Sequence, residues 1–242
     1  MPWYKLTKKA IIPKVMSTQK YFLCAWIFFS WPALALDQRL SLGLIGGITA
    51  NGASGESVDI LYDSKGQKVA GALSNTLIGG EFGMLMQYQL PEYFFGVQTE
   101  LMFLFNRGLT YHDVVNGDFK ARIQGHQAAL NFLLHGIITT NDMISFVVFA
   151  GPSFTFPMTN FQQSIAYKKT GATDRMTFTP LGVSYGIVAG LGLHIELGPG
   201  FFLIDGRFAM DFTDFVSERN ISLNTPLAVQ VGYSFYLLGG KR

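Results

Sequence analysis

Beyond residue 37 the chain alternates apolar and polar side chains with a period of two residues, which is the period of a β-strand. The alternation is clearest over 183–197 and least regular over 144–156. In all, the alternation marks eight stretches that we expect to be strands: 40–51, 77–88, 94–106, 123–135, 144–156, 183–197, 201–212 and 227–237. The pattern therefore predicts an all-β chain.

The connections between these stretches alternate between long and short. Segments 52–76, 107–122 and 157–182 are long and 213–226 is of medium length, whereas the intervening links are tight turns such as Gly198-Pro199-Gly200. Short turns at one rim and long loops at the other are typical of an antiparallel up-and-down barrel of the bacterial outer membrane. An even strand number brings both ends of the chain to the short-turn, periplasmic side.

The contents of the two faces indicate which one points outward. One face holds almost only Leu, Ile, Val, Phe, Met and Tyr, and the other holds Gly, Ser, Gln, Asn, His and charged residues. Small and polar side chains suit the narrow interior of an eight-stranded ring. A strand of about 12 residues, tilted by ~45°, also rises far enough for an apolar band of ~25 Å. We therefore predict a transmembrane eight-stranded antiparallel β-barrel with its bulky face toward lipid.

Two other folds are weaker alternatives. A soluble barrel would have to turn its small, glycine-rich face to water. Helices across an inner membrane would have to use 143–167 and 220–240, which lack charged residues but are interrupted by Pro152, Pro157 and Pro226.

The start of the chain differs from the rest and predicts export. Five lysines and no acid precede residue 36, and an apolar run over 21–31 leads to the A-x-A pattern at Ala33–Ala35. We expect 1–35 to be a cleaved signal peptide and 36–242 to be the barrel; translation from Met16 would shorten the leader. The apolar run is too short for a membrane-spanning anchor. Cys24 lies inside it, so we expect no disulfide or thiolate site in the mature chain.

Composition excludes several functions. Acids outnumber bases after residue 36, which argues against nucleic-acid binding. Four scattered histidines without His-x-x-x-His spacing indicate no metal site, and we identify no cofactor-binding or catalytic residue. Lipid A deacylases of similar size use a His–Ser–Glu set on the outer barrel face. His126 falls on the outward register and His112 in a loop, without a matching acid and serine. We therefore expect no enzyme.

The last stretch carries a family resemblance. Gln230 and Gly232, followed by outward-facing Phe235 and Leu237, resemble the C-terminal signal that the barrel-assembly machinery reads in outer-membrane barrels. The mature chain as a whole is similar in architecture to the small eight-stranded group: the OmpA membrane domain, OmpX, the opacity proteins and OmpW-like porins. The resemblance implies the bacterial outer membrane, contact with its lipid, and, by our expectation, a monomer.

The inward-facing polar positions predict a network in the lumen. Its expected members are Glu81, Glu100, Asp205, Arg207, Asp211, His135, His194 and Glu196, with Arg39 near the periplasmic mouth. Glu100 and Arg207 stand at similar heights on strands that lie opposite each other in the ring. We predict a contact between them, similar in kind to the central Glu–Arg pair of OmpA-type barrels; the alternative is that each charge bonds only its own neighbours. The excess of acids would make any pore prefer cations.

Basic residues are expected near the long-loop rim, where they would contact anionic lipid head groups or a ligand, or simply remain solvated. These are Arg107, Lys120, Arg122, Lys168, Lys169 and Arg175.

Three functions remain open. The first is a surface role in which loops 52–76 and 157–182 contact an extracellular ligand. The second is a narrow porin, or an OmpW-like channel for small hydrophobic solutes. The third and most distant is a lipid-modifying enzyme.

Overall fold

The chain divides into two units, Met1–Leu36 and Asp37–Arg242. A computed structural model describes residues of the second unit. The described residues are 39–54, 61–70, 72–90, 94–113, 115, 117–140, 143–180, 182–213 and 222–238. The expected signal peptide and its cleavage site lie outside these residues and stay predictions. Among the described residues, no helix has the length and apolar character needed to cross a membrane.

Twelve strands are formed by the described residues. They are β1 (Arg39–Ser54), β2 (Leu61–Tyr62), β3 (Lys68–Val69), β4 (Ala72–Gln89), β5 (Phe95–Asp113), β6 (Phe119–Thr139), β7 (Ile144–Pro157), β8 (Phe161–Tyr167), β9 (Thr173–Phe178), β10 (Ser184–Leu197), β11 (Gly200–Asp211) and β12 (Ser222–Leu238).

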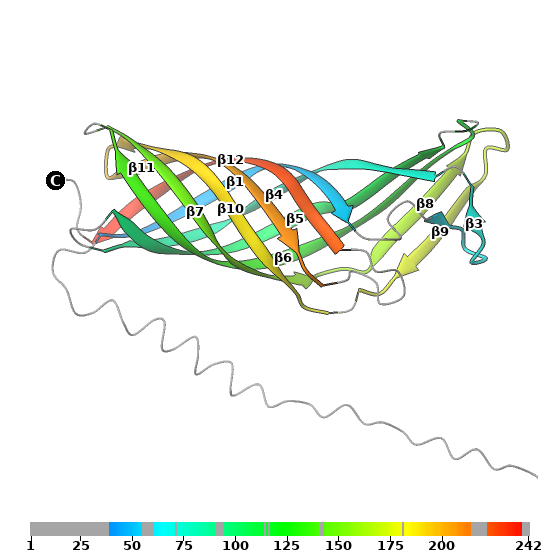
Figure 1. The fold of residues 1–242 in the computed structure, drawn as a ribbon, viewed down its shortest axis with the longest axis horizontal. Helices are drawn as coiled ribbons and strands as arrows, with labels where there is room; N and C mark the ends of the chain where they lie inside the picture. Colours follow the sequence, from blue (N-terminus) through cyan, green and yellow to red (C-terminus); the bar gives the residue numbers. More distant parts are fainter. Residues whose placement is uncertain are drawn as a thin grey trace, which may run out of the picture. The chain divides into compact units, whose positions relative to one another are not determined.

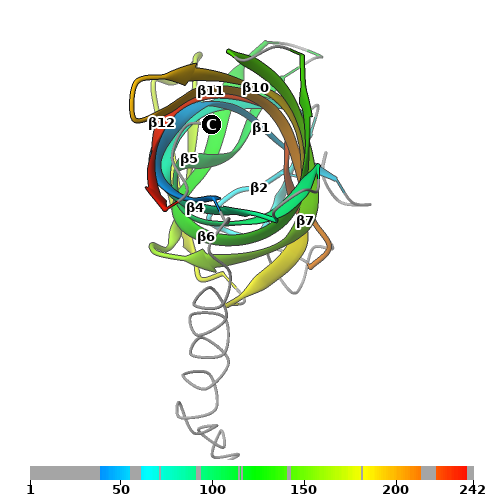
Figure 2. The same cartoon turned by 90° about the vertical axis from the view of Figure 1, so that its left-hand side faces the viewer.

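Eight of these strands close a ring. The antiparallel pairing runs β1–β4–β5–β6–β7–β10–β11–β12 and returns to β1, so all eight predicted strands are present and each pairs on both sides. Figure 2 shows the ring end-on, and Figure 1 shows its strands tilted along the barrel. The stretch expected to be least regular, 144–156, forms the continuous strand β7. The predicted fold class is confirmed.

The outer surface of the ring is apolar, as the alternation predicts. Leu44, Ile48, Ile78, Leu134 and Leu191 are among the large hydrophobic side chains that are more than 60 % exposed. A closed ring pairs its backbone groups internally and leaves such side chains to lipid, which is how a β-structure spans a membrane. In barrels of this kind, which occur in the bacterial outer membrane, the short-turn end faces the periplasm and the other end faces outward.

The interior is less polar than the sequence suggested. Apolar side chains also point inward and form two buried layers in the barrel. One is made of Ile45, Leu85, Met102, Ala129, Phe201 and Leu203, and the other of Leu133, Val147, Phe149 and Val188. The ring is narrow enough for side chains from opposite walls to pack together, so inward positions need volume as well as polarity.

Two segments expected to be long loops are largely strand. β5 continues past the barrel and ends at Asp113, and β6 begins beyond the barrel at Phe119. Segment 157–182 contains β8 and β9, which extend the sheet from the edge of β6. Together with β2, β3 and the first residues of β4, these strands form what we call the extracellular extension (residues 61–69, 72–76, 109–113, 119–124 and 161–178), seen beyond one end of the ring in Figure 1.

The extracellular extension has its own apolar core. Leu61, Leu109, Tyr111, Phe119, Ala121, Ile123, Phe161, Ile165 and Leu223 form one buried cluster. Leu61 of β2 is fully buried in it, and Gln163 of β8 donates to the Tyr62 carbonyl at 2.6 Å. The β2–β3 hairpin therefore packs against the extended wall.

Candidate functional site

A buried ion cluster occupies the middle of the lumen. Arg207 Nη1 donates to Glu100 Oε2 at 2.8 Å and Nη2 donates to Oε1 at 3.1 Å, so the predicted Glu100–Arg207 contact is present and is bidentate. Asp205 Oδ2 accepts a further bond from Nη2 at 3.3 Å. The side chains of the three residues are 0–4 % exposed. We call them the central ion cluster; a fork geometry of this kind is the strongest arrangement for an arginine–carboxylate pair.

Neutral side chains hold the Glu100 carboxylate in place. Gln98 donates to Oε1 at 2.6 Å, and Asn131 donates to Oε2 at 2.8 Å. The hydroxyl of Ser153 in turn donates to the Asn131 side-chain oxygen at 2.7 Å. Glu100 is thus fully satisfied by donors from β5, β6 and β11, which a buried carboxylate requires.

Strand pairing explains why these residues meet. β5 and β11 lie four strands apart in the ring of eight, so their inward side chains face each other across the lumen. Phe149 supplies an aromatic face 5.0 Å from the Arg207 guanidinium carbon. Gly192, opposite Asp205 on β10, leaves room for the Asp205 carboxylate, since a Cβ at that glycine would collide with it. The cluster is a product of both register and local side-chain size.

The other predicted members do not join one continuous network. Glu81 accepts a hydrogen bond from Gln230. The sequence had suggested Gln230 only as part of an assembly signal. His135 shares a 2.9 Å hydrogen bond with Gln87. The ring of His194 stacks on Phe201, with ring centroids 4.4 Å apart. The lumen holds several separate polar groups with apolar layers between them.

Arg107 corrects the sequence prediction. It was expected at the long-loop rim, but it lies inside the lumen, where Nη2 pairs with Asp211 at 2.9 Å. The register of β5 against β6 shifts between Leu104 and Arg107, and Asn106 adopts a positive φ of 52°. This β-bulge adds a residue to β5 and turns Arg107 from the outer to the inner face. Asn106, followed two residues later by Gly108, was the signal of this bulge in the sequence, because asparagine tolerates a positive φ.

A small polar cavity opens at the periplasmic mouth. Its volume is about 50 Å³. Arg39 Nη1 lies 3.7 Å from Glu196 Oε1, which also accepts a 2.5 Å hydrogen bond from the Tyr236 hydroxyl. His194 lines the same cavity. Glu196 and His194 therefore belong to the mouth and not to the central ion cluster.

Metal-ligating and catalytic side chains lie apart from one another in the described residues. Within them, no three His, Cys, Asp or Glu side chains gather closely enough to hold a metal ion. His126 lies on the outer surface, with its ring centroid 5.9 Å from that of Phe105. Where the chain is described, no histidine hydrogen-bonds a serine or a carboxylate, the pairing that activates a serine nucleophile.

The remaining predicted residues lie on the surface. Phe235 and Leu237 point outward and are more than half exposed, whereas Gly232 pairs with Ile45 and Leu203, where a Cβ would meet the Leu44 carbonyl. Lys168 is exposed, and Lys169 pairs with Asp118 at the tip of the extension. Lys120, Arg122 and Arg175 lie on the outer face of the extension. The assembly signal itself stays a prediction.

Comparisons give structural neighbours only. No protein-family model matches the chain, and no curated protein matches it. Among solved structures, OprG of Pseudomonas aeruginosa is 12 % identical with a TM-score of 0.48, over 84 % of this chain and 96 % of that one. Ail of Yersinia pestis, solved with a heparin analogue, is 13 % identical with a TM-score of 0.38, over 81 % and 99 %. The protease OmpT of Escherichia coli is 10 % identical with a TM-score of 0.36, over 83 % and 96 %.

At these identities the assignment rests on the chain's own strand pairing and apolar outer surface. The chain is an eight-stranded antiparallel transmembrane β-barrel of the bacterial outer-membrane type.

Proposed function

We propose that this protein is a closed outer-membrane barrel that acts through its extracellular extension, in a surface-interaction role. The central ion cluster carries this proposal. Its three charged groups, with Gln98 and Asn131 packed around Glu100, occupy the lumen at mid-height and are almost completely buried. A solute crossing the barrel would have to break a bidentate ion pair away from bulk water.

The extension supports the same proposal. Its strands continue from β5 and β6 and pack around the apolar cluster that includes Phe161 and Ile165. A folded sheet with its own core holds its outer residues in fixed positions, and such positioning favours recognition by contact. Loop residues in 52–76 and segment 157–182 would then present the contact surface for an extracellular ligand. The strand that carries Gln230 and Phe235 would be read by the assembly machinery.

Planar-bilayer conductance tests the closed lumen. We expect the refolded protein to show no steady current, and Arg207→Ala to produce openings because it removes the central cation. Arg175→Ala, which removes an arginine from the outer face of the extension, is the matched control and should stay closed. Steady conductance by the unmodified protein would overturn the proposal, as would an Arg207→Ala variant that is folded and remains closed.

A narrow channel is the second candidate, and the mouth cavity is the observation that favours it. Arg39, Glu196 and His194 line a polar opening from the periplasmic end. In a channel, this opening would connect to a path past the central ion cluster, and the excess of lumen acids would select cations. Cation-selective current from the unmodified protein would favour this function over the closed barrel.

A further inference from the structure

Three basic side chains form a row on the outer face of the extracellular extension. Arg122 of β6 pairs with Ser164 of β8, and Ser164 pairs with Arg175 of β9. The two arginines are therefore two strands apart, or ~10 Å, and Lys120 stands two residues along β6 from Arg122, or ~7 Å. We call Lys120, Arg122 and Arg175 the basic row.

The outward direction of the basic row follows from the alternation of its strands. On β6, the neighbours Ala121 and Ile123 are buried in the apolar core of the extension, so Lys120 and Arg122 point the other way. On β9, Phe178 packs against the same core, and Arg175 stands on the opposite face. All three cations thus share one surface.

Nearby acids do not neutralise the basic row. Among the described residues, no carboxylate lies within 4 Å of any of its three cations. Asp118 pairs with Lys169, and Asp174 accepts a hydrogen bond from the Ser64 backbone N–H on the inner side of the sheet. The row therefore has positive charge that no described carboxylate neutralises.

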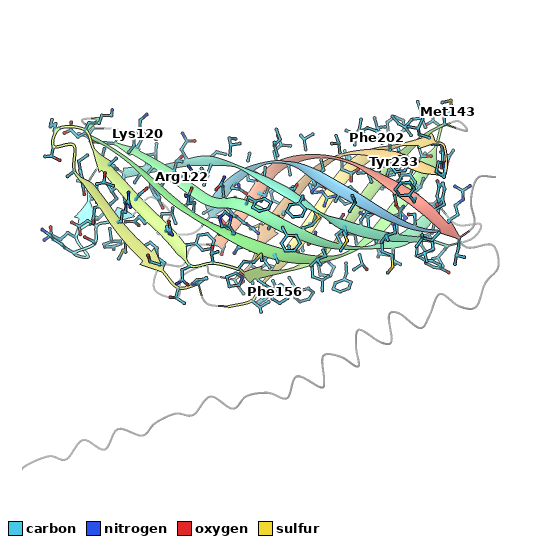
Figure 3. The ribbon with its side chains drawn as sticks, turned by 180° about the vertical axis from the view of Figure 1, so that it is seen from behind. Lys120, Arg122, Met143, Phe156, Phe202 and Tyr233 are labelled. Atoms are coloured by element: carbon cyan, nitrogen blue, oxygen red, sulfur yellow. The ribbon has the colours of Figure 1, made fainter. Side chains whose placement is uncertain are left out.

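The basic row continues the lipid-facing surface of the barrel. On β6, the outward residues from Ile138 up to Ala128 are apolar or Gly136, and they are followed by His126, Gln124, Arg122 and Lys120. Six residues separate Ala128 from Arg122, which is a rise of ~14 Å for a tilted strand. Figure 3 shows Lys120 and Arg122 toward the opposite end of the barrel from Met143 and Tyr233. Long basic side chains at this height reach back toward the head-group layer.

We propose that the basic row binds phosphate groups of the glycolipid in the outer leaflet of the membrane. Guanidinium groups match phosphate oxygens with two parallel hydrogen bonds, and the lysine adds a point charge. The row stands above the lipid-facing apolar surface, on the same face of the sheet and within reach of the head groups, which favours a membrane lipid over a soluble anion. The inference goes beyond the proposed function and needs only the placement of the barrel in the membrane.

Titration of the refolded full-length protein in neutral detergent with bisphosphorylated lipid A tests this binding. Phosphate-free lipid A is the comparison ligand, and physiological salt limits long-range attraction. We expect Lys120→Gln/Arg122→Gln/Arg175→Gln to raise the Kd on the order of 100-fold, from about fivefold for each lost cation. Lys65→Gln/Lys68→Gln/Lys168→Gln removes the same charge from other exposed sites of the extension and should change the Kd by less than about threefold.

Several results would overturn the proposal. These are equal affinity for phosphate-free lipid A, an unchanged Kd in the basic-row variant, equal weakening in the control variant, or stronger binding of a soluble sulfated polysaccharide. Heat-modifiable gel migration verifies that each variant is folded; if the triple variant fails this check, the three single substitutions replace it. A conducting barrel would refute the proposed function without affecting this binding measurement.

Discussion

The barrel and the extracellular extension have opposite polarity, although the same strands run through both. Within the barrel, β6 points Gln127, Asn131 and His135 inward and Leu130 and Leu134 outward. Within the extension, the same strand continues the same alternation without a register shift against its neighbour β8, but the polarity is reversed. Ala121 and Ile123 now point into an apolar core, and Lys120 and Arg122 point outward.

The reversal occurs within a few residues around Gly125. Phe161 of β8 lies against this glycine, where a Cβ would approach the aromatic ring to 2.6 Å, and so the apolar core of the extension begins there. The strand geometry is the same on both sides, but the surroundings change from lipid to water. Side-chain polarity on each face is therefore set by the solvent that the face meets.

The largest expected effect comes from breaking the polar interior of the barrel. Glu100→Ala removes one partner of a buried pair and leaves Arg207 without its main counter-ion, which costs ~3–5 kcal/mol. Urea unfolding followed by heat-modifiable migration measures this loss. Asp118→Ala breaks the exposed pair with Lys169 and should cost below about 1 kcal/mol. Equal losses in the two variants would mean that the central ion cluster does not depend on burial.

The apolar interior of the extension gives a loss of similar size but in a different place. Phe161 is fully buried, and Phe161→Ala would open a cavity that costs ~3–5 kcal/mol. Because the barrel ring does not depend on this core, we expect hydrogen exchange to rise over 161–178 while β10 and β11 remain protected. Phe154→Ala, at an outward position of β7, is the control. Loss of protection throughout the ring would show that the two regions unfold together.

One substitution on each side of Gly125 tests the reversal directly. Leu134→Arg places a charge near the middle of the lipid-facing apolar run of β6 and should cost ~2–4 kcal/mol. Gln124→Arg, on the same face of the same strand in the extension, should change stability by less than about 0.5 kcal/mol. Equal effects in lipid vesicles would contradict the placement of the membrane.

Removing the bulge at Asn106 should lower stability by less than the substitutions above, but it should affect both the barrel and the extension. Asn106→Val puts a β-branched residue at positive φ and should cost ~1–2 kcal/mol, whereas Asn106→Gly should be tolerated. If the valine variant avoids the bulge, Arg107 turns outward and loses Asp211. A double-mutant cycle with Asp211→Ala then gives a reduced coupling energy; an unchanged coupling would mean that another feature positions Arg107.

The smallest effect concerns the attachment of the β2–β3 hairpin. Hydrogen bonds from the Ser64 side chain and backbone lower the pKa of Asp174 below its ordinary value of 3.8. A lowered pKa stabilises the attachment at pH values above 3.8, and the contribution is lost as the pH falls through the lowered pKa. The protection factors of the amides over 61–69, which correct for the slower intrinsic exchange in acid, should therefore fall as the pH drops below 3.8, and Asp174→Asn should remove this pH dependence. Protection factors that fall equally in the variant would assign the response to another group.

Local sequence pattern was sufficient for the ring. Alternation with period two in eight stretches, and the bulky composition of one face, gave the strand number, the outward face and the opposition of Glu100 and Arg207. These features follow from the pleat and from ring closure, which depend on residue order alone. The apolar residues of the inner face were harder to interpret, because packing across the lumen depends on which walls meet.

Only the tertiary structure decided the path of the long connections and the position of Arg107. Segments 107–122 and 157–182 were expected to be loops because they lie between the stretches in which the alternation was recognised. In the structure their apolar side chains pack into the core of the extension instead of facing lipid. Arg107 was expected at the long-loop rim because the predicted strand ended at residue 106. In the structure the strand continues through a bulge, which adds one residue and changes the face of every side chain after it. A sequence determines the alternation of side chains along a strand, whereas register shifts and the surrounding solvent determine what each face contacts.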